Sequence, residues 1–219
     1  MWGARSDVGC VRPHNEDSYL VQSPLFCVCD GMGGHAAGEV ASSIAVETIA
    51  KTAPQSAAAA RLAAAVEAAN AAVIEAALNG LGKPGMGCTA TCAYIENDTL
   101  AIAHVGDSRA YLLHEGTLIR VTRDHSYVEE LVDAGEITAD EARVHPNRSV
   151  ITRALGSDPA MYADHFTLHI EEGDRLILCS DGLSSMIPDS DIENIATQSS
   201  SAQISVSYTH LTLPTKLEV

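Results

Sequence analysis

Basic residues are scarce in this chain of 219 residues. It has 13 Lys and Arg against 29 Asp and Glu, which gives a formal net charge of −16. Such a surface repels polyanions, because nucleic-acid binding depends on Lys and Arg that neutralise phosphates. Nucleic acid is therefore excluded as an expected partner. The excess acid must be solvated surface or, in part, a site that binds cations.

Long hydrophobic runs are also lacking. No stretch approaches the ~18 consecutive apolar residues that a membrane helix needs, and the start, Met1 to Asp7, lacks the apolar region of a signal peptide. We therefore expect a soluble, cytoplasmic protein with no membrane partner. The 46% of apolar residues is typical of a folded globular protein, and the length predicts one domain, or two at most.

Zinc and disulfide patterns are absent too. The six cysteines form no C-x-x-C pair and lie mostly in apolar runs, which predicts reduced thiols in the core. They are Cys10, Cys27, Cys29, Cys88, Cys92 and Cys179. No cysteine is followed six positions later by the arginine that the phosphate loop of cysteine phosphatases requires, and there is no G-x-S-x-G elbow. The absence of both patterns argues against catalysis by a cysteine thiolate or by the serine nucleophile of a hydrolase.

The chain does contain apolar, β-branched runs joined by short turns. They predict strands over residues 19–21, 25–29, 88–95, 99–105, 109–113, 165–170 and 175–179. The connections are too short for crossover helices, so the sheets should be largely antiparallel. Helical spacing predicts helices over 38–51 and 56–79 and a helical hairpin over 126–143. This order favours an α+β layered domain over a doubly wound parallel sheet.

Three of these apolar runs end in the same way, on an aspartate: Asp30, Asp107 and Asp181. A further acidic pair, Glu16-Asp17, lies just before the first clear strand. An ordinary turn explains any one of them, but carboxylates that converge on one cleft raise one another's pKa unless cations neutralise them. Oxygen ligands without a His/Cys cluster suit Mg²⁺ or Mn²⁺ better than zinc. The pattern therefore predicts a carboxylate metal site.

Two such ions would activate water and stabilise an in-line displacement at phosphorus. The substrate phosphate also needs an anchor, and a guanidinium offers a permanently charged fork for its oxygens. Arg12, four residues before Glu16, is the candidate, with a surface arginine as the alternative. Glycine after Asp30 and after Asp181 lets the backbone come close, so that a carbonyl could be a further ligand.

These residues fall in four ordered motifs. The motifs are Ser6-Asp7-x-Gly9-x-x-Arg12-x-x-Asn15-Glu16-Asp17, Asp30-Gly31-Met32-Gly33-Gly34-His35, Gly106-Asp107-Ser108-Arg109-Ala110 and Ser180-Asp181-Gly182-Leu183. The set resembles the PPM family, the metal-dependent serine/threonine protein phosphatases of type 2C, over roughly residues 5–195. The segment from Asp30 to Glu39 is similar to the bacterial branch, whose members act against protein kinases.

The resemblance implies a four-layer α-β-β-α sandwich, in which two antiparallel sheets are flanked by antiparallel helix pairs. It also implies a cleft with two, or three, Mn²⁺ or Mg²⁺ ions at one end. By position, Asp30 bridges both ions and the Gly31 carbonyl binds one of them. Asp181 binds the first ion, and Asp107 with Asp181 holds a third.

The same resemblance assigns Glu16 to the second-metal side, with Asp17 holding metal-bound water, and makes Arg12 the phosphate clamp. Met32 stands where animal members carry a histidine that protonates the leaving alcohol. Metal-bound water is expected to replace that histidine, and His35 and His125 are weaker candidates. Residues 126–143 correspond to a mobile flap beside the cleft.

The expected activity is hydrolysis of phosphoserine and phosphothreonine in proteins, with a Ser/Thr protein kinase or its substrates as partners and a monomer as the active form. The family closes with a further Asp-Asn that supplies another metal ligand, and nothing in the chain fits it. We therefore expect a C-terminally incomplete phosphatase-like catalytic domain over 1–198 and an unrelated Ser/Thr-rich tail over 199–219. The alternatives are a catalytically impaired phosphoprotein-binding or regulatory module that lacks the last metal-binding Asp, and a generic hydrolase of small phosphoesters.

Overall fold

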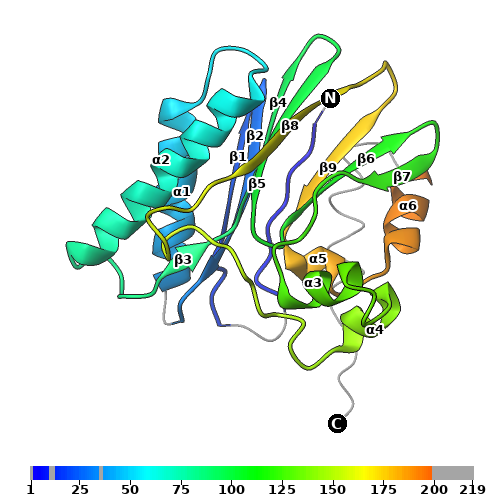
Figure 1. The fold of residues 1–219 in the computed structure, drawn as a ribbon. Helices are drawn as coiled ribbons and strands as arrows, with labels where there is room; N and C mark the ends of the chain where they lie inside the picture. Colours follow the sequence, from blue (N-terminus) through cyan, green and yellow to red (C-terminus); the bar gives the residue numbers. More distant parts are fainter. Residues whose placement is uncertain (1, 10–12, 35–36, 199–219) are drawn as a thin grey trace.

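Two antiparallel sheets form the centre of the molecule (Figure 1). The computed structural model describes residues 2–9, 13–34 and 37–198. The larger sheet has the order β1-β2-β4-β5-β8, and the short strand β3 pairs with β2. Its strands are β1 (Asp17–Gln22), β2 (Leu25–Met32), β3 (Gly87–Cys88), β4 (Ala90–Glu96), β5 (Thr99–Val105) and β8 (Asp164–His169). The smaller sheet has the order β7-β6-β9, with β6 (Arg109–His114), β7 (Thr117–Arg120) and β9 (Arg175–Cys179).

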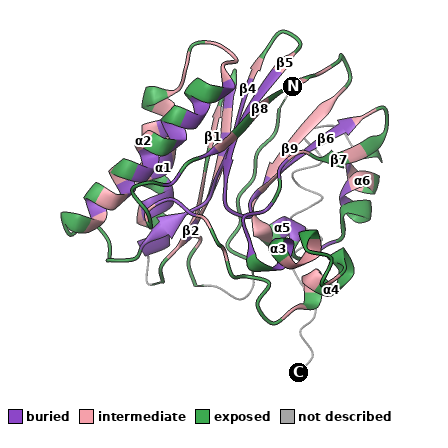
Figure 2. Ribbon diagram, in the orientation of Figure 1, coloured by how far each residue is buried: buried purple, intermediate pink, exposed green. Residues whose placement is uncertain are grey.

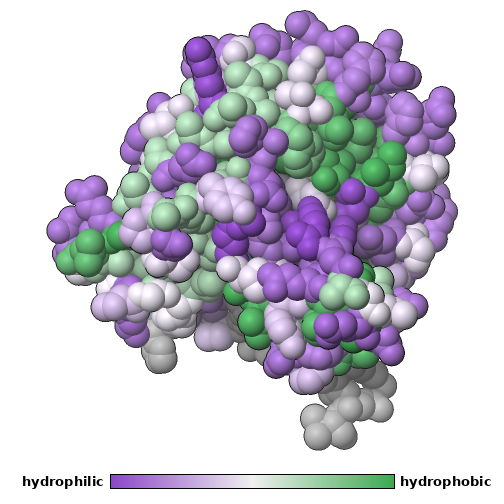
Figure 3. Space-filling view, viewed as in Figure 1, coloured by the Kyte–Doolittle hydropathy of each residue, from purple (hydrophilic) through white to green (hydrophobic). Residues whose placement is uncertain are grey.

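Helices cover the outer faces of both sheets. The antiparallel pair α1 (Ala37–Thr52) and α2 (Ala59–Leu78) lies on the larger sheet, and α6 (Asp189–Gln198) packs against β6 and β7. Three shorter helices lie at one end of the sheets: α3 (Tyr127–Asp133), α4 (Ala139–Val144) and α5 (Asp181–Ser184). Seen from the side of Figure 3, hydrophilic residues gather in the middle of the molecule, above α3 and α5.

Three hydrophobic clusters fill the three interfaces between these layers. The largest joins α1 and α2 to the larger sheet, and its helix residues are mostly alanines, which let the helices come close to the strands. A second cluster, which includes Ile102 and Ala110, lies between the two sheets. The third joins the smaller sheet to Ile192 and Ala196 of α6. Figure 2 shows the buried faces of α1 and α2 turned toward the sheet.

The α+β class with two antiparallel sheets is confirmed. The strands expected over 99–105 and 175–179 have these bounds in the structure, and the helical hairpin over 126–143 appears as α3 and α4. The sequence reading missed β7 and α5. In the described part of the chain, the smaller sheet is covered by the single helix α6, where the resemblance implied a pair. No helix in the described ranges has the length and apolar character needed to cross a bilayer.

Candidate metal centre

Asp17 and Asp30 lie opposite each other in the β1–β2 ladder. Along β2 the side chains alternate, so that Leu25, Cys27 and Cys29 are buried among α1 and α2 while Asp30 points to the other face, toward the smaller sheet. Hydrophobic alternation therefore determines which face receives the carboxylate. A shift of one residue in register would turn Asp30 into the helix-facing core.

Asp107 and Asp181 approach the same place from two other strands. Asp107 follows β5 directly after Gly106 and is only 8% exposed, while Asp181 follows β9 and begins α5. Burial, and then Asp17, Asp181 and Asp107, raise the pKa of Asp30 to about 9. Burial and Asp181 raise the pKa of Asp107 to about 7. The structure thus brings three of the other predicted site residues into electrostatic contact with Asp30.

This carboxylate cluster, Asp17, Asp30, Asp107 and Asp181, suits a hard divalent cation. Its donors are all oxygens, and the raised pKa values show that negative charge is poorly compensated there. Among the described residues, however, no three His, Cys, Asp or Glu side chains are already arranged with the spacing of a metal site. The chemistry of the donor set nevertheless fits Mn²⁺ or Mg²⁺.

Close backbone packing holds the Asp30 side of the cluster. A Cβ added at Gly31 would lie 2.2 Å from the Gly38 carbonyl oxygen and 2.5 Å from the Glu16 carbonyl oxygen. Only glycine fits between β2, the start of α1 and the chain before β1. The Gly31 N–H also donates to the Glu16 carbonyl at 3.1 Å, and that carbonyl accepts a second bond from the Ser42 hydroxyl at 2.7 Å.

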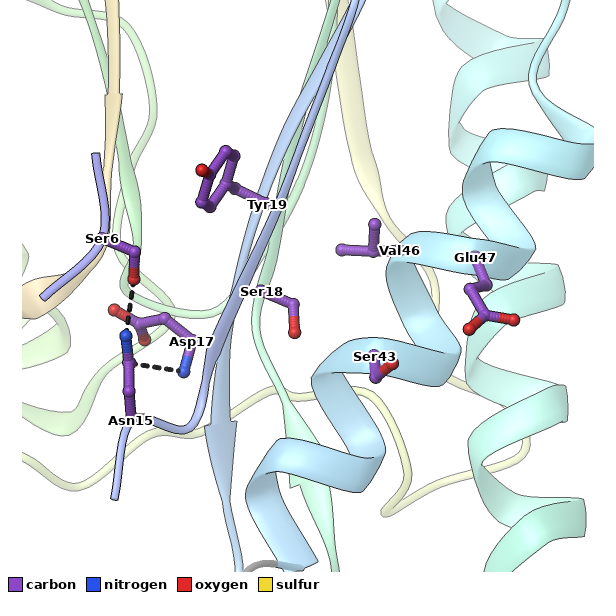
Figure 4. A pocket seen from close by; sticks show the side chains of 8 residues that line it. All are labelled: Ser6, Asn15, Asp17, Ser18, Tyr19, Ser43, Val46 and Glu47. Carbon is purple, nitrogen blue, oxygen red and sulfur yellow. Dashed lines mark hydrogen bonds between the residues drawn. The ribbon is translucent and has the colours of Figure 1, made fainter. Parts of the chain in front are cut away.

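Side-chain hydrogen bonds hold the segment that leads into Asp17, as Figure 4 shows. The Asp17 N–H donates to the Asn15 Oδ1 at 3.0 Å, and the Asn15 amide donates to the Ser6 hydroxyl at 2.6 Å. From the smaller sheet, the Ser180 hydroxyl donates to the Asp17 Oδ2 at 2.9 Å. Ser180 therefore links the last residues of β9 to the first residue of β1, across the gap between the two sheets.

The sequence reading missed two buried hydroxyl groups, those of Thr89 and Ser108, that lie next to the carboxylate cluster. The Asp30 N–H donates to the Thr89 Oγ1 at 2.9 Å, and the Thr89 and Ser108 hydroxyl oxygens are 2.7 Å apart. Both side chains are fully buried. The position of Ser108 directly after Asp107 was the available signal, but only the fold shows that it meets Thr89.

Arg109, in the third motif, is engaged within the protein. Its guanidinium donates to both carboxylate oxygens of Asp124, with Nη2 to Oδ2 at 2.7 Å, and its Nη1 donates to the Tyr111 hydroxyl. This pairing neutralises the charge of Arg109 within the protein. The predicted phosphate clamp, Arg12, and the candidate acid His35 lie outside the described residues.

The second candidate acid, His125, is buried. Its Nδ1 accepts a hydrogen bond from the Gly106 N–H at 3.0 Å, and its Nε2 lies 3.0 Å from the Asp164 Oδ2. Both ring nitrogens are therefore committed to protein groups. This geometry favours a structural contribution over proton transfer to a leaving group.

Five cysteines lie in the described part of the chain, and all are buried free thiols: Cys27, Cys29, Cys88, Cys92 and Cys179. Burial helps to raise the pKa of each of them. The prediction of reduced core thiols is confirmed for these five, and Cys10 lies outside the described residues.

Comparison with known proteins gives the family. The model of the protein phosphatase 2C family matches residues 5–211, so the chain belongs to this family. It is 43% identical over 197 residues to the serine/threonine protein phosphatase PstP of Mycobacterium tuberculosis, a match that covers 87% of this chain but 38% of that protein. It is 37% identical to the serine/threonine phosphatase stp of Listeria welshimeri, with coverage of 87% and 81%.

Solved structures agree with this assignment. A crystal structure of M. tuberculosis PstP superposes with a TM-score of 0.90 at 40% identity, over 95% of this chain and 90% of that one. A second structure, of the PstP catalytic domain in complex with two manganese ions, has a TM-score of 0.87 at 38% identity, over 95% and 89%. The resemblance identified from the four motifs is confirmed, and the function class it implied is that of the family: metal-dependent serine/threonine protein phosphatase.

Proposed function

We propose that this chain removes phosphate from phosphoserine and phosphothreonine in proteins with the help of bound Mn²⁺ or Mg²⁺. The observation that carries the proposal is the carboxylate cluster, in which burial and the three acids Asp17, Asp181 and Asp107 raise the pKa of Asp30 to about 9. A pocket that disfavours its own negative charge favours cations. Membership of the protein phosphatase 2C family supports the same chemistry.

The proposed holders of two, or three, ions are Glu16, Asp17, Asp30, the Gly31 carbonyl, Asp107 and Asp181. Bound Mn²⁺ or Mg²⁺ would lower the pKa of water and balance charge on the phosphoryl group. Arg12 is the proposed clamp for the substrate phosphate. The residues around the site do the positioning: Ser180 holds Asp17, and Thr89 holds the backbone of Asp30.

The finer assignments are also proposals. We infer phosphoproteins as substrates, with a Ser/Thr protein kinase or its targets among them, and a cytoplasmic monomer. We place the catalytic domain over 1–198 and treat 199–219 as a separate tail, although the family match continues to residue 211. A chain that ends at residue 198 tests this boundary, because it should keep the thermal stability and activity of the full chain.

A direct assay tests the function. The purified chain should hydrolyse a phosphothreonine peptide and p-nitrophenyl phosphate with Mn²⁺, and it should lose both activities on chelation. Asp30→Asn should abolish turnover, while the exposed acid Glu172, as Glu172→Gln, serves as the matched control. Activity that is indifferent to chelator would contradict the proposal. A preference for the small ester over the peptide would favour a generic phosphoesterase.

A second candidate is a phosphoprotein-binding module with an impaired site. The absence from the sequence of the closing Asp-Asn that supplies a further metal ligand in the family is the observation that favours it. It predicts phosphopeptide binding that depends on Arg12 but no turnover at any Mn²⁺ concentration. Calorimetric titration separates the two candidates, since a working centre should take up at least two ions and an impaired one fewer.

A further inference from the structure

The turn that carries Asp107 is held on both sides by buried side chains. On one side the Ser108 hydroxyl meets Thr89 at 2.7 Å. On the other, the Gly106 N–H donates to the Nδ1 of His125 at 3.0 Å, and the His125 N–H donates to the Gly106 carbonyl at 2.7 Å. His125 thus satisfies both backbone polar groups of the residue before Asp107.

The second ring nitrogen of His125 begins a chain of contacts that reaches the surface. Because Nδ1 accepts from an amide, Nε2 must carry the proton, and it donates to the Asp164 Oδ2 at 3.0 Å. The other oxygen of Asp164 accepts from Arg153 at 2.6 Å. The Arg153 guanidinium lies 4.1 Å from the ring centroid of the exposed Tyr162 and donates to its hydroxyl. Asp164 therefore fixes the histidine tautomer.

The setting of His125 keeps this tautomer in place. Its side chain is 4% exposed, and its ring stacks on that of His104 with centroids 5.0 Å apart. Its carbonyl accepts from the Thr152 N–H at 2.8 Å, beside the bridge between Ser126 and Ile151 that closes the base of the α3–α4 hairpin. His125 therefore joins that hairpin, β8 and the Asp107 turn.

We propose that His125 is a positioning residue for the metal centre: its Nδ1, oriented through Nε2 by Asp164, holds the Gly106 amide and so sets where the Asp107 carboxylate stands. The inference rests on the proposed function, because it assigns Asp107 to the ions. Both ring nitrogens of His125 are bonded to protein groups, so its influence on the ions would pass through Gly106. In metal sites, removing a group that orients a ligand without touching the metal weakens metal affinity by about 10–100-fold.

Two substitutions separate the contacts of the ring. In His125→Asn the amide oxygen replaces Nδ1 and can still accept from Gly106, but the side chain is too short for Asp164. In His125→Gln the amide nitrogen replaces Nε2 and can still donate to Asp164, but nothing accepts from Gly106. The matched control is His165→Gln, because His165 is exposed on the neighbouring position of β8.

The measurement is calorimetric titration of the metal-stripped full chain with Mn²⁺, followed by the Mn²⁺ dependence of activity and the KM and kcat for p-nitrophenyl phosphate. We expect His125→Gln to weaken Mn²⁺ binding about tenfold or more, His125→Asn to weaken it less, and the control to match the wild type. The KM for substrate at saturating Mn²⁺ should change little. A purely structural role would lower thermal stability without this order of Mn²⁺ affinities.

A further variant guards against loss of folding. In Asp164→Asn, the new amide oxygen can still accept from Arg153, while the amide NH₂ faces His125 and donates to Nε2. The ring must then carry its proton on Nδ1, which can no longer accept from Gly106. Asp164 is 42% exposed, so the chain should fold, and Mn²⁺ binding should weaken several-fold. Wild-type Mn²⁺ affinity in both His125→Gln and Asp164→Asn would overturn this inference alone. A wild-type chain that takes up no Mn²⁺ would overturn the proposed function, and this inference with it.

Discussion

The two Asp-Gly pairs of the site look alike in the sequence and differ in the structure. After Asp30, a Cβ on Gly31 would meet backbone oxygens at 2.2 and 2.5 Å. After Asp181, a Cβ on Gly182 would meet only the Ser180 Oγ, at 3.6 Å, an ordinary contact. The first glycine is required by packing, whereas the second occupies the first turn of the short helix α5.

The surroundings of the two aspartates show the same contrast. Asp30 lies in a strand paired on both edges, by β1 and β4 with β3, and its amide is held by Thr89. Asp181 follows β9, which pairs in the described part of the chain with β6 alone. One side of the centre is therefore built by tight backbone packing. The other depends on a few side-chain contacts, and we expect bound ions to order it further.

The largest expected effect on stability comes from replacing the two glycines themselves. Gly31→Ala should unfold the chain or destabilise it by about 3 kcal/mol or more, because the added methyl meets backbone atoms that cannot move separately. Gly182→Ala should be neutral or stabilise by up to about 1 kcal/mol, since alanine is the better helix former. Urea unfolding of the two variants checks the difference. Equal losses would show that the two sides are packed alike.

A second prediction concerns the charge of Asp30, which lies on the tightly packed side of the centre. Folding raises the pKa of Asp30 to about 9 from its ordinary value near 3.8, so the folded state binds a proton that the unfolded state releases. Without metal, this group therefore stabilises the fold least at high pH, and stability falls as pH rises from about 4 to 9. Asp30→Asn should raise the free energy of unfolding of the metal-stripped chain at pH 8, by on the order of 2 kcal/mol.

Asp107 provides the graded comparison, because its pKa is raised only to about 7. Asp107→Asn should therefore give a smaller gain at pH 8 than Asp30→Asn. With Mn²⁺ present the wild type should instead be the most stable of the three chains, since each variant would lose a proposed ligand and the wild type would gain binding free energy. Denaturant titrations at pH 5.5 and pH 8, with and without Mn²⁺, measure all three chains. A loss of stability in metal-stripped Asp30→Asn at pH 8 would contradict the charge argument.

Much of this contrast was beyond sequence reasoning. The strand ends at Asp30, Asp107 and Asp181 were predictable, because hydrophobic alternation and turn residues are local signals. The meeting of Thr89 with Ser108, or of Ser180 with Asp17, depends on how two sheets stack, which no local pattern encodes. The strand β7 was missed because its burial is slight, and the tight fit of Gly31 against Gly38 depends on the packing of α1 against β2.

A third prediction concerns the buried histidine behind the cluster. Burial, followed by His125, lowers the pKa of His104 to about 3, so only the unfolded state takes up a proton as the pH falls below about 6.5. Stability should then fall by about 1.4 kcal/mol per pH unit on acidification from that value. His104→Gln should flatten the slope between pH 6.5 and 4.5. His114 is the control, because it is only partly buried and its hydrogen bond to Asp174 raises its pKa, the opposite direction to that of His104.

The smallest effect is a difference in the labelling rates of the cysteines, which reports where the fold opens locally without any change in stability. Cys27, Cys29, Cys88 and Cys92 lie on the packed side and are at most 1% exposed, whereas Cys179 is 8% exposed at the end of β9. In a Cys10→Ser chain, a thiol reagent at low denaturant should label Cys179 first, through local opening, and the other four only on global unfolding. Mn²⁺ should slow the labelling of Cys179 much more than that of the other four, because Asp181 is a proposed ligand and bound ions would hold it in place. Simultaneous labelling of all five thiols would mean that the two sides open as one unit.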